Sequence, residues 1–358
     1  MNHPQWLAFC RGLRTRGGDC VPSAFEHPSA RYRRLGPRLG SGCYGTVYAF
    51  VAESSDGHPL PEGVPPSFAL KVINEDCVAE LAAVAALQHA PPEAQLGVTP
   101  AVAVRVSGLR AQLCMPLFDG SLQEWLGPSP VAARDALRIM RRISRSVEAL
   151  WNAGLAYCDL KKPNVLVRDG ERVMVLGDLG SICIGGRDAL FTYPPHRAVA
   201  LSQEAAVDGF VSDLCEADIA WSLASLLLCL LKGDRWADMF LSTRGLRSRG
   251  LKLGRMDFAI ERVADEVASV ARSLRQRGDL EAAAGVMVGL RAWRDCNGSI
   301  RGFCDSIRRT RASSAPAVLY RDSLLPLKRL PPPVDLMPTV ALSDSVVSSS
   351  EESSASAS

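Results

Sequence analysis

The chain has 358 residues, 47% of them hydrophobic, and a formal net charge of +3. This length and hydrophobic content exclude a wholly disordered protein and suffice for a folded domain of about 270 residues with flanking segments. Neither the small net charge nor the composition indicates a direct nucleic-acid interface. Eleven cysteines without a Cys-x-x-Cys pair argue against a zinc site and predict a reducing compartment.

Neither a secretion signal nor a membrane span is predicted. Residues 1–20 lack the apolar core of a signal peptide. The longest apolar run, Ile219–Leu231, is interrupted by two serines and is too short to cross a bilayer, so it is typical of a buried central helix. We therefore expect an intracellular protein without a membrane partner.

Four regions are expected in chain order. Residues 1–34 contain clustered arginines and predict a basic, irregular arm that is solvated, in preference to a nuclear-import signal. Residues 35–118 predict a small β-rich region with one main helix, and residues 119–312 a larger helical region. Residues 313–358 are rich in proline, serine and acidic residues, which predicts a disordered tail. That tail is either an inert solubilising segment or one that folds back onto arginines of the helical region.

A glycine-rich hairpin is predicted at Leu39-Gly40-Ser41-Gly42-Cys43-Tyr44-Gly45-Thr46-Val47-Tyr48. Glycines let a backbone close over phosphate groups without side-chain clash, although a plain tight turn has the same pattern. The strand Phe68-Ala69-Leu70-Lys71 follows, and we expect its lysine to point into a cleft. Glu80 begins an apolar helix pattern and is the predicted partner of Lys71. Glu75 is the alternative, but it leaves almost no room to turn from strand to helix.

The most informative pattern is Tyr157-Cys158-Asp159-Leu160-Lys161-Lys162-Pro163-Asn164, followed by Gly177-Asp178-Leu179-Gly180. It contains an Asp, a Lys two residues later, an Asn five residues later and then a second Asp. Phosphoryl transfer needs this set of groups. One carboxylate orients the acceptor hydroxyl, the lysine neutralises the moving phosphoryl group, and the Asn and the second Asp hold Mg²⁺.

The residues around this pattern predict where it lies in the fold. Apolar residues at helical spacing predict a helix over residues 136–152 that ends before Gly154. Two short apolar runs, residues 165–167 and 173–176, predict a hairpin. Asn164 and Asp178 would then lie at the same end of that hairpin and converge on one metal ion.

Together these segments resemble the eukaryotic-type protein kinase family. The resemblance implies an α+β, two-lobed fold with a small β-rich lobe and a larger helical lobe. It implies that ATP and Mg²⁺ are the cofactors and that Lys71 grips the α- and β-phosphates. It assigns catalytic roles to Asp159, Lys161, Lys71 and Glu80, and metal ligation to Asn164 and Asp178.

The segment Leu113–Leu122 resembles the strand and linker that join the two kinase lobes. Met115 would guard the back of the adenine pocket, and the N–H of Leu117 or Phe118 would face the adenine edge because Pro116 has no N–H. The resemblance implies nucleotide contacts from the following residues: Leu39, Gly40, Ser41, Gly42, Cys43, Gly45, Val47, Ala69, Lys71, Met115, Leu117 and Leu166.

Several positions depart from the kinase pattern. Cys158 replaces the Arg that receives an activation-loop phosphate, so we expect activity independent of loop phosphorylation. Tyr157 and Leu179 replace the usual His and Phe, and both can fill an apolar spine. His196 stands where a Glu is expected, which leaves a bridge of the lower lobe missing or rebuilt. Asp218 resembles the helix Asp that anchors the catalytic loop.

The divergent second half and the short lead into the first helix are most similar to the conserved herpesvirus serine/threonine protein kinases. That resemblance implies viral and host proteins as substrates, and the virion tegument and host nucleus as locations. Some members of that group also phosphorylate nucleoside analogues. Two alternatives stay open, a pseudokinase scaffold and a small-molecule phosphotransferase of the aminoglycoside or choline kinase type. Lys161 favours a protein hydroxyl acceptor.

Overall fold

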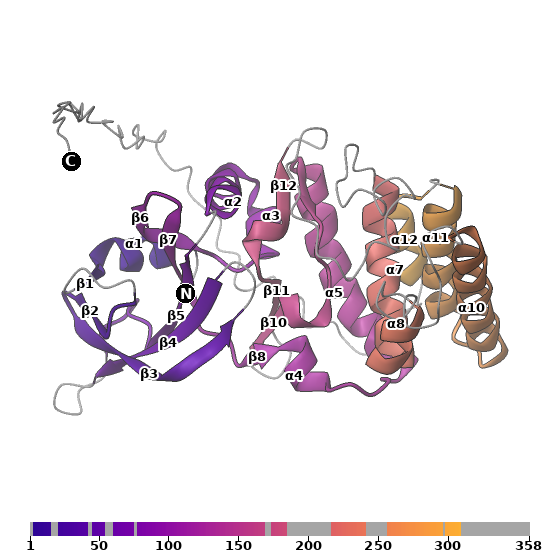
Figure 1. The fold of residues 1–358 in the computed structure, drawn as a ribbon, viewed down its shortest axis with the longest axis horizontal. Coiled ribbons are helices and arrows are strands. Elements are labelled where there is room, and N and C mark those ends of the chain that lie inside the picture. The colour runs from indigo at the N-terminus through magenta and orange to yellow at the C-terminus, as the bar shows by residue number, and fades with distance from the viewer. Residues whose placement is uncertain are drawn as a thin grey trace, which may run out of the picture. The chain divides into compact units, whose positions relative to one another are not determined.

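An antiparallel sheet of seven strands occupies the first third of the chain (Figure 1). We analysed a computed structural model, and its described residues all belong to one unit, Met1–Thr310. The expected tail lies outside the described residues. The structure describes residues 3–15, 21–41, 45–53, 60–74, 77–168, 173–184, 216–240, 256–295 and 298–308.

The seven strands pair in the order β1-β2-β3-β4-β5-β7-β6. The central strand β5 lies between β4 and β7, and six of its seven residues are buried. Burial on both faces explains why this strand is apolar throughout its buried length except for Lys71. The strands are β1 (Arg14–Thr15), β2 (Ala24–His27), β3 (Ala30–Ser41), β4 (Gly45–Glu53), β5 (Ser67–Ile73), β6 (Val102–Ser107) and β7 (Arg110–Pro116).

The irregular arm expected for residues 1–34 is wrong where the structure describes them. α1 (His3–Gly12) packs beside β6, and β1, β2 and the start of β3 extend the sheet. Trp6 and Phe9 of α1 are buried with Tyr32 and Phe68, and the rings of Phe9 and Phe68 meet edge to face at 5.9 Å. Burial of these rings makes the segment part of the fold, although its arginines suggest a solvated arm.

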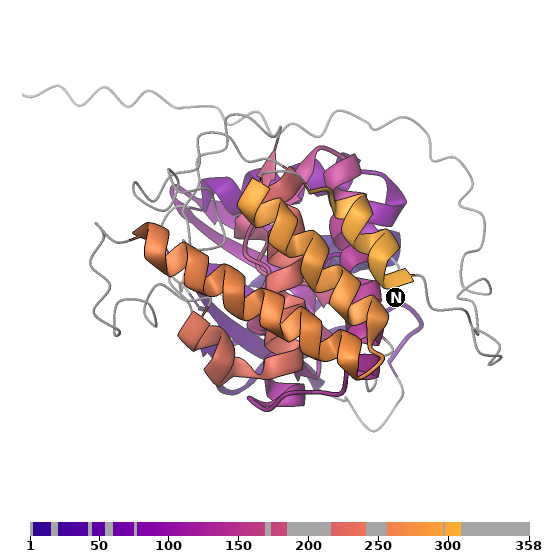
Figure 2. The same cartoon turned by 90° about the vertical axis from the view of Figure 1, so that its right-hand side faces the viewer.

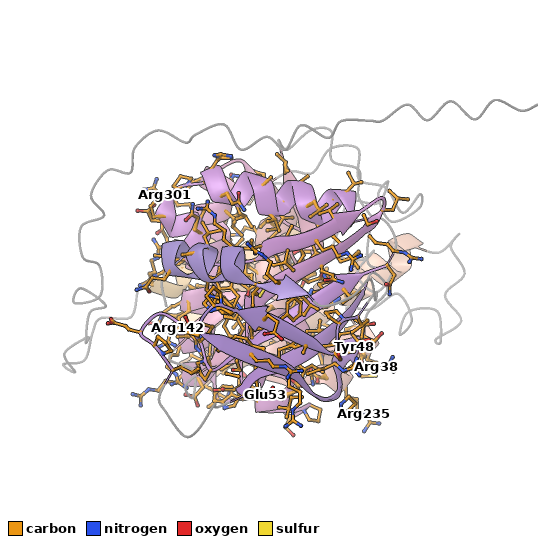
Figure 3. All side chains as sticks on the ribbon, turned by 90° about the vertical axis from the view of Figure 1, so that its left-hand side faces the viewer. Arg38, Tyr48, Glu53, Arg142, Arg235 and Arg301 are labelled. Atoms are coloured by element: carbon orange, nitrogen blue, oxygen red, sulfur yellow. The ribbon has the colours of Figure 1, made fainter. Side chains whose placement is uncertain are left out.

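Two arginines of this segment, Arg31 and Arg33, are exposed on β3. Tyr32 is fully buried, whereas Arg31 and Arg33 on either side of it alternate outward, as in a half-buried strand. Both arginines approach the Glu53 carboxylate of β4, at 3.4 and 3.6 Å. Figure 3 looks onto this end of the sheet, with Glu53 labelled on β4. The positive character noticed in the sequence is therefore partly neutralised by a neighbouring strand.

A small three-stranded sheet and a two-stranded sheet lie between the large sheet and the main helices (Figure 1). The 3₁₀ turns η1 (Lys162–Asn164) and η2 (Leu179–Ser181) lie directly beside these strands. The predicted hairpin is confirmed, because β10 and β11 pair antiparallel with Val165 opposite Leu176. The strands are β8 (Gly120–Ser121), β9 (Leu155–Tyr157), β10 (Val165–Arg168), β11 (Val173–Leu176) and β12 (Ile182–Ile184).

Helices make up most of the remaining described chain. α5 buries the apolar stripe predicted within residues 136–152, and Gly154 follows it with φ 75°, a left-handed conformation that suits glycine. The helices after α1 are α2 (Val78–His89), α3 (Pro92–Leu96), α4 (Leu122–Leu126), α5 (Ala133–Asn152), α7 (Glu216–Lys232), α8 (Asp234–Phe240), α10 (Met256–Gln276), α11 (Leu280–Asp295) and α12 (Ile300–Arg308).

The buried central helix predicted at residues 219–231 is α7, which packs against α5, α8, α11 and α12. Figure 2 shows α10, α11 and α12 together on the side of the helical region that faces the viewer. A Cβ atom at Gly289 of α11 would come within 1.9 Å of Ala224 on α7, so glycine permits this close approach. Within the described part of the chain, no helix is both long and apolar enough to span a bilayer. The fold is mixed α+β.

Candidate active site

Lys71 is the one charged residue of the central strand β5. Its ammonium nitrogen Nζ donates to Glu80 Oε1 of α2 at 2.8 Å and to Asp178 Oδ1, just after β11, also at 2.8 Å. Lys71 and Glu80 are only 8% and 4% exposed. The pair predicted between Lys71 and Glu80 is therefore present, while the alternative Glu75 lies outside the described residues.

The electrostatics keep this buried lysine charged. Burial alone would lower the pKa of the Lys71 ammonium, but the carboxylates of Glu80 and Asp178 outweigh burial and hold the pKa above its ordinary value. Burial raises the pKa of Glu80, and Lys71 opposes that shift. A charged ammonium that is largely removed from water attracts an anionic group such as a phosphate more strongly than an exposed one does.

Asp178 has an unusual backbone. Its φ is 50°, and it is the one non-glycine residue with positive φ among those that the structure describes. η2 begins directly after it, and Gly180 in that turn would place a Cβ only 3.5 Å from Glu80 Oε2. The turn that follows Asp178 therefore lies against the first turn of α2, beside the Glu80 carboxylate.

Asp159 lies on the loop between β9 and η1 and is 4% exposed. Its carboxylate oxygen Oδ2 accepts from Lys161 Nζ at 2.5 Å and from Asn164 Nδ2 at 2.8 Å. The same Asn164 amide also donates to the Asp159 backbone carbonyl at 2.9 Å. The other carboxylate oxygen, Oδ1, is buried and accepts no hydrogen bond from the described residues. This oxygen therefore keeps a hydrogen-bonding capacity that the described residues do not use.

The hairpin of β10 and β11 connects these two groups of side chains. The Gly177 N–H donates to the Asn164 carbonyl at 2.7 Å, and the Tyr157 hydroxyl donates to the Gly177 carbonyl at 2.5 Å. Asn164 and Asp178 therefore precede and follow the same hairpin at the same end, as the sequence predicts. The structure brings together six predicted residues from four separate segments: Lys71, Glu80, Asp159, Lys161, Asn164 and Asp178.

Residues that depart from the kinase pattern have structural roles. Tyr157 and Leu179 are each 1% exposed, so both side chains belong to the buried core. Burial raises the pKa of the Tyr157 hydroxyl well above its usual range, so that the hydroxyl remains a donor. Cys158 Sγ lies 3.2 Å from Cys183 Sγ of β12. Asp218 lies in the first turn of α7 and raises the pKa of Cys158, after the larger effects of Cys183 and burial.

A second buried lysine braces the same loop and was not predicted as a site residue. Lys162 is 3% exposed, and its Nζ donates to the Gly127 carbonyl at 2.7 Å and forms an ion pair with Asp234 of α8. Gln123 Nε2 of α4 donates to the other Asp234 oxygen at 2.7 Å. The only hint in the sequence is the Lys161-Lys162 doublet, and a distant acidic partner cannot be found from spacing alone.

Most of the described residues that are expected to contact a nucleotide lie on strands β3, β4, β5 and β7, which are neighbours in the large sheet. β5 pairs Ala69 with Met115 of β7, and Met115 is 8% exposed. Gly40 of β3 lies opposite Val47 of β4 across the predicted glycine-rich hairpin. Ser41 and Gly45 end and begin these strands, whereas Gly42 and Cys43 lie outside the described residues. Leu39 is half-exposed on β3, Leu117 follows β7, and Leu166 is partly exposed on β10.

The oxygen atoms available at the site suit Mg²⁺, which prefers hard oxygen ligands and is held by one or two carboxylates together with substrate phosphates. Asn164 donates its amide nitrogen to Asp159, so its side-chain oxygen is the atom that would face a metal, and Asp178 has Oδ2 in addition to the oxygen that contacts Lys71. Among the described residues, no group of three or more His, Cys, Asp or Glu side chains forms a metal site by itself. These residues therefore fit a metal ion that arrives with a phosphate ligand.

The expected activation-segment residues, including Thr192 and His196, lie outside the described residues.

A scan of protein-family models and a search of curated proteins found no match to the chain. The geometry of the site and the sequence motifs therefore carry the functional argument.

Proposed function

We propose that the protein is a Mg²⁺- and ATP-dependent serine/threonine protein kinase with a two-lobed kinase fold. The observation that carries the proposal is the bridge from Lys71 to both Glu80 and Asp178, next to the Asp159–Lys161–Asn164 cluster. Lys71 and Asp178 are 107 positions apart in the sequence. A chance match of sequence motifs would not be expected to bring two such distant residues together. Here they also meet the other groups that phosphoryl transfer needs.

Each residue of the site has a separate role in the proposed reaction. Lys71 binds nucleotide phosphates, and Glu80 fixes the position of its ammonium. Asp159 Oδ1 accepts the hydrogen bond of the acceptor hydroxyl and then its proton as the phosphoryl group moves. Lys161 lies on the other oxygen of the same carboxylate, where its charge stabilises the negative charge that develops during transfer.

Asn164 and the Asp178 carboxylate would hold Mg²⁺. When bound, the ion neutralises phosphate charge and orients the transferred group. The adenine base would lie between Val47 and Ala69 on one side and Leu166 on the other, with Met115 behind it. The N–H of Leu117 or Phe118 would donate to its edge.

Lys161 supports a protein hydroxyl as the acceptor, in preference to a small alcohol. We further propose viral and host proteins as substrates, and the virion tegument and host nucleus as locations, on the strength of the herpesvirus kinase resemblance. With Cys158 at the position of the phosphate-binding Arg, the activity would not depend on phosphorylation of the activation segment.

The test offers purified protein γ-labelled ATP and Mg²⁺ with casein, histone and small alcohols in separate reactions. We expect labelled serine and threonine in a protein substrate and loss of transfer when EDTA removes Mg²⁺. Lys71→Met should abolish transfer, whereas Lys232→Met, at an exposed lysine of α7, should not. Labelling of small alcohols alone would identify a small-molecule phosphotransferase. Nucleotide binding without transfer to any acceptor would identify a pseudokinase, and either result overturns the proposal.

A further inference from the structure

We propose that Cys158 and Cys183 form a reversible disulfide, a modification site that switches off the candidate active site. The two residues come from different strand segments, and their sulfur atoms lie 3.2 Å apart in the thiol state. Cys158 directly precedes Asp159, and Cys183 lies five residues after Asp178. The pair therefore joins the two segments that supply the essential carboxylates.

The strand pairing explains why these sulfurs meet. β9 and β12 pair antiparallel with Tyr157 opposite Ile182. The Cys158 N–H continues this pairing by donating to the Ser181 carbonyl at 3.0 Å. Cys158 and Cys183 are thus diagonal neighbours on one face of the strand pair, opposite to the face of Tyr157.

Formation of the bond brings the two sulfurs and the two strand ends closer together. A disulfide has an S–S distance of about 2.05 Å, so the sulfurs must move together by roughly 1.2 Å from their 3.2 Å separation. Cα atoms of diagonal strand neighbours lie about 7–8 Å apart, above the roughly 4.4–6.8 Å of most disulfides, so the backbone must also move. Formation of the bond therefore pulls the ends of β9 and β12 toward each other.

Hydrogen peroxide is the oxidant in this proposal. One thiolate attacks a peroxide oxygen and the O–O bond breaks, which leaves a sulfenic acid and a hydroxide that becomes water with the thiol proton. The second thiol then attacks the sulfenic sulfur, and a second water leaves as the S–S bond forms. Two thiols and one peroxide thus give one disulfide and two waters.

Accessibility favours this pair over Cys10 of α1 and Cys114 of β7, which also contact each other. Cys158 is partly exposed and Cys183 is buried, whereas Cys10 and Cys114 are both buried. The hydrogen bond with Cys183, together with burial, raises the pKa of the Cys158 thiol well above its ordinary value. Because the thiolate is the reactive form, oxidation at neutral pH is slow, and the pair stays reduced until peroxide persists.

The expected effect on activity follows from the position of Asp159. A pull on the end of β9 shifts the loop that begins at Cys158, and with it the Asp159 carboxylate. Misplacement of a catalytic group by about 1 Å lowers a rate by roughly 100-fold. This loss rests on the proposed kinase function, whereas the disulfide itself does not.

Peptide mapping tests the bond without any activity assay. The full chain is treated with hydrogen peroxide, its remaining thiols are alkylated, and the digest is analysed by mass spectrometry with and without dithiothreitol. We expect a cross-linked peptide that joins Cys158 to Cys183 and disappears on reduction. Alkylation of both residues after peroxide treatment, or a Cys10–Cys114 bridge in their place, overturns the proposal.

Variants connect the bond to the rate. Peroxide should lower wild-type phosphoryl transfer by roughly 100-fold, and dithiothreitol should restore it. Cys183→Ser should keep the reduced rate and lose the sensitivity to peroxide. The control Cys304→Ser, at a thiol that contacts the Ser144 carbonyl, should remain sensitive. An intact disulfide with an unchanged rate refutes the switch alone, and a mapped disulfide in a protein that never transfers phosphate refutes the kinase proposal alone.

Discussion

Replacement of Asp159 by asparagine removes one negative charge and almost no volume. The oxygen of the new side-chain amide can still accept from Asn164 and Lys161, as Asp159 Oδ2 does at 2.8 and 2.5 Å. The amide NH₂ then takes the place of Oδ1, which is buried and accepts no bond from any described residue. The change therefore removes the proton acceptor and leaves most of the supporting contacts of the loop in place.

The substitution is expected to affect the catalytic rate more than the stability of the fold. Loss of a positioned general base lowers a rate by about 10²–10⁴-fold. This corresponds to about 2.7–5.4 kcal/mol of transition-state free energy. A buried amide donor without an acceptor lowers the free energy of unfolding by about 1–3 kcal/mol. If the variant is still folded at the assay temperature, a fall in its rate is therefore due to the lost general base and not to unfolding.

Initial rates with labelled ATP and casein, urea unfolding and nucleotide affinity measured on the same preparations separate these effects. We expect kcat to fall by about 10²–10⁴-fold, with ATP affinity nearly unchanged, because the proposed role of Asp159 is to position the acceptor and not the nucleotide. The control Asp135→Asn changes an exposed carboxylate on α5 that approaches Arg138 at 3.4 Å, and it should leave both quantities unchanged. An Asp159→Asn protein with the wild-type rate would refute the assignment.

Three further predictions concern other contacts. Glu80→Gln should stop most transfer in the same assay. A buried charge that loses its partner lowers the free energy of unfolding by roughly 3–5 kcal/mol. The loss measured in urea should be smaller here, because Lys71 keeps its contact with Asp178. Burial raises the pKa of Asp234, but hydrogen bonds from three neighbouring side chains outweigh it and lower the pKa below 3.8. The resulting stability is present above pH 3.8 and is lost as the pH falls through the lower folded pKa, so unfolding curves of Asp234→Asn should depend less on pH there than those of wild type. Trp6→Ala should lower the free energy of unfolding by about 3–5 kcal/mol, whereas Trp125→Ala, at a side chain that is 44% exposed, should change it little.

Local patterns were enough to predict much of the site. The β10–β11 hairpin follows from two short apolar runs around a polar turn, and α5 from apolar spacing over several turns. The contact between Lys71 and Glu80 was also predictable, because so few residues separate a strand lysine from the start of the next helix. In each case the partners are close in sequence, so that spacing alone limits where they can lie.

The parts that were not predicted depend on long-range packing. The ion pair of Lys162 with Asp234 joins a loop to a helix far along the chain, and neither residue has a neighbour that indicates its partner. The prediction of an irregular arm for residues 1–34 was wrong because it rested on the positive charge of the segment. The alternation of exposed and buried residues along the strand was not considered. Tyr32 is buried between two exposed arginines, and only the aromatic cluster under the sheet reveals why.

The backbone of Asp178 bears on the choice between a catalyst and a scaffold. A non-glycine residue with positive φ is strained by about 1–3 kcal/mol, although Asp tolerates this region better than most residues. Glycine would form the same turn without that strain. The chain instead has a carboxylate there, 2.8 Å from a buried ammonium. In a scaffold this side chain would only add a second carboxylate to Lys71, which Glu80 already pairs, whereas phosphoryl transfer needs its charge at this point. The strain at Asp178 therefore favours the catalytic interpretation over the scaffold.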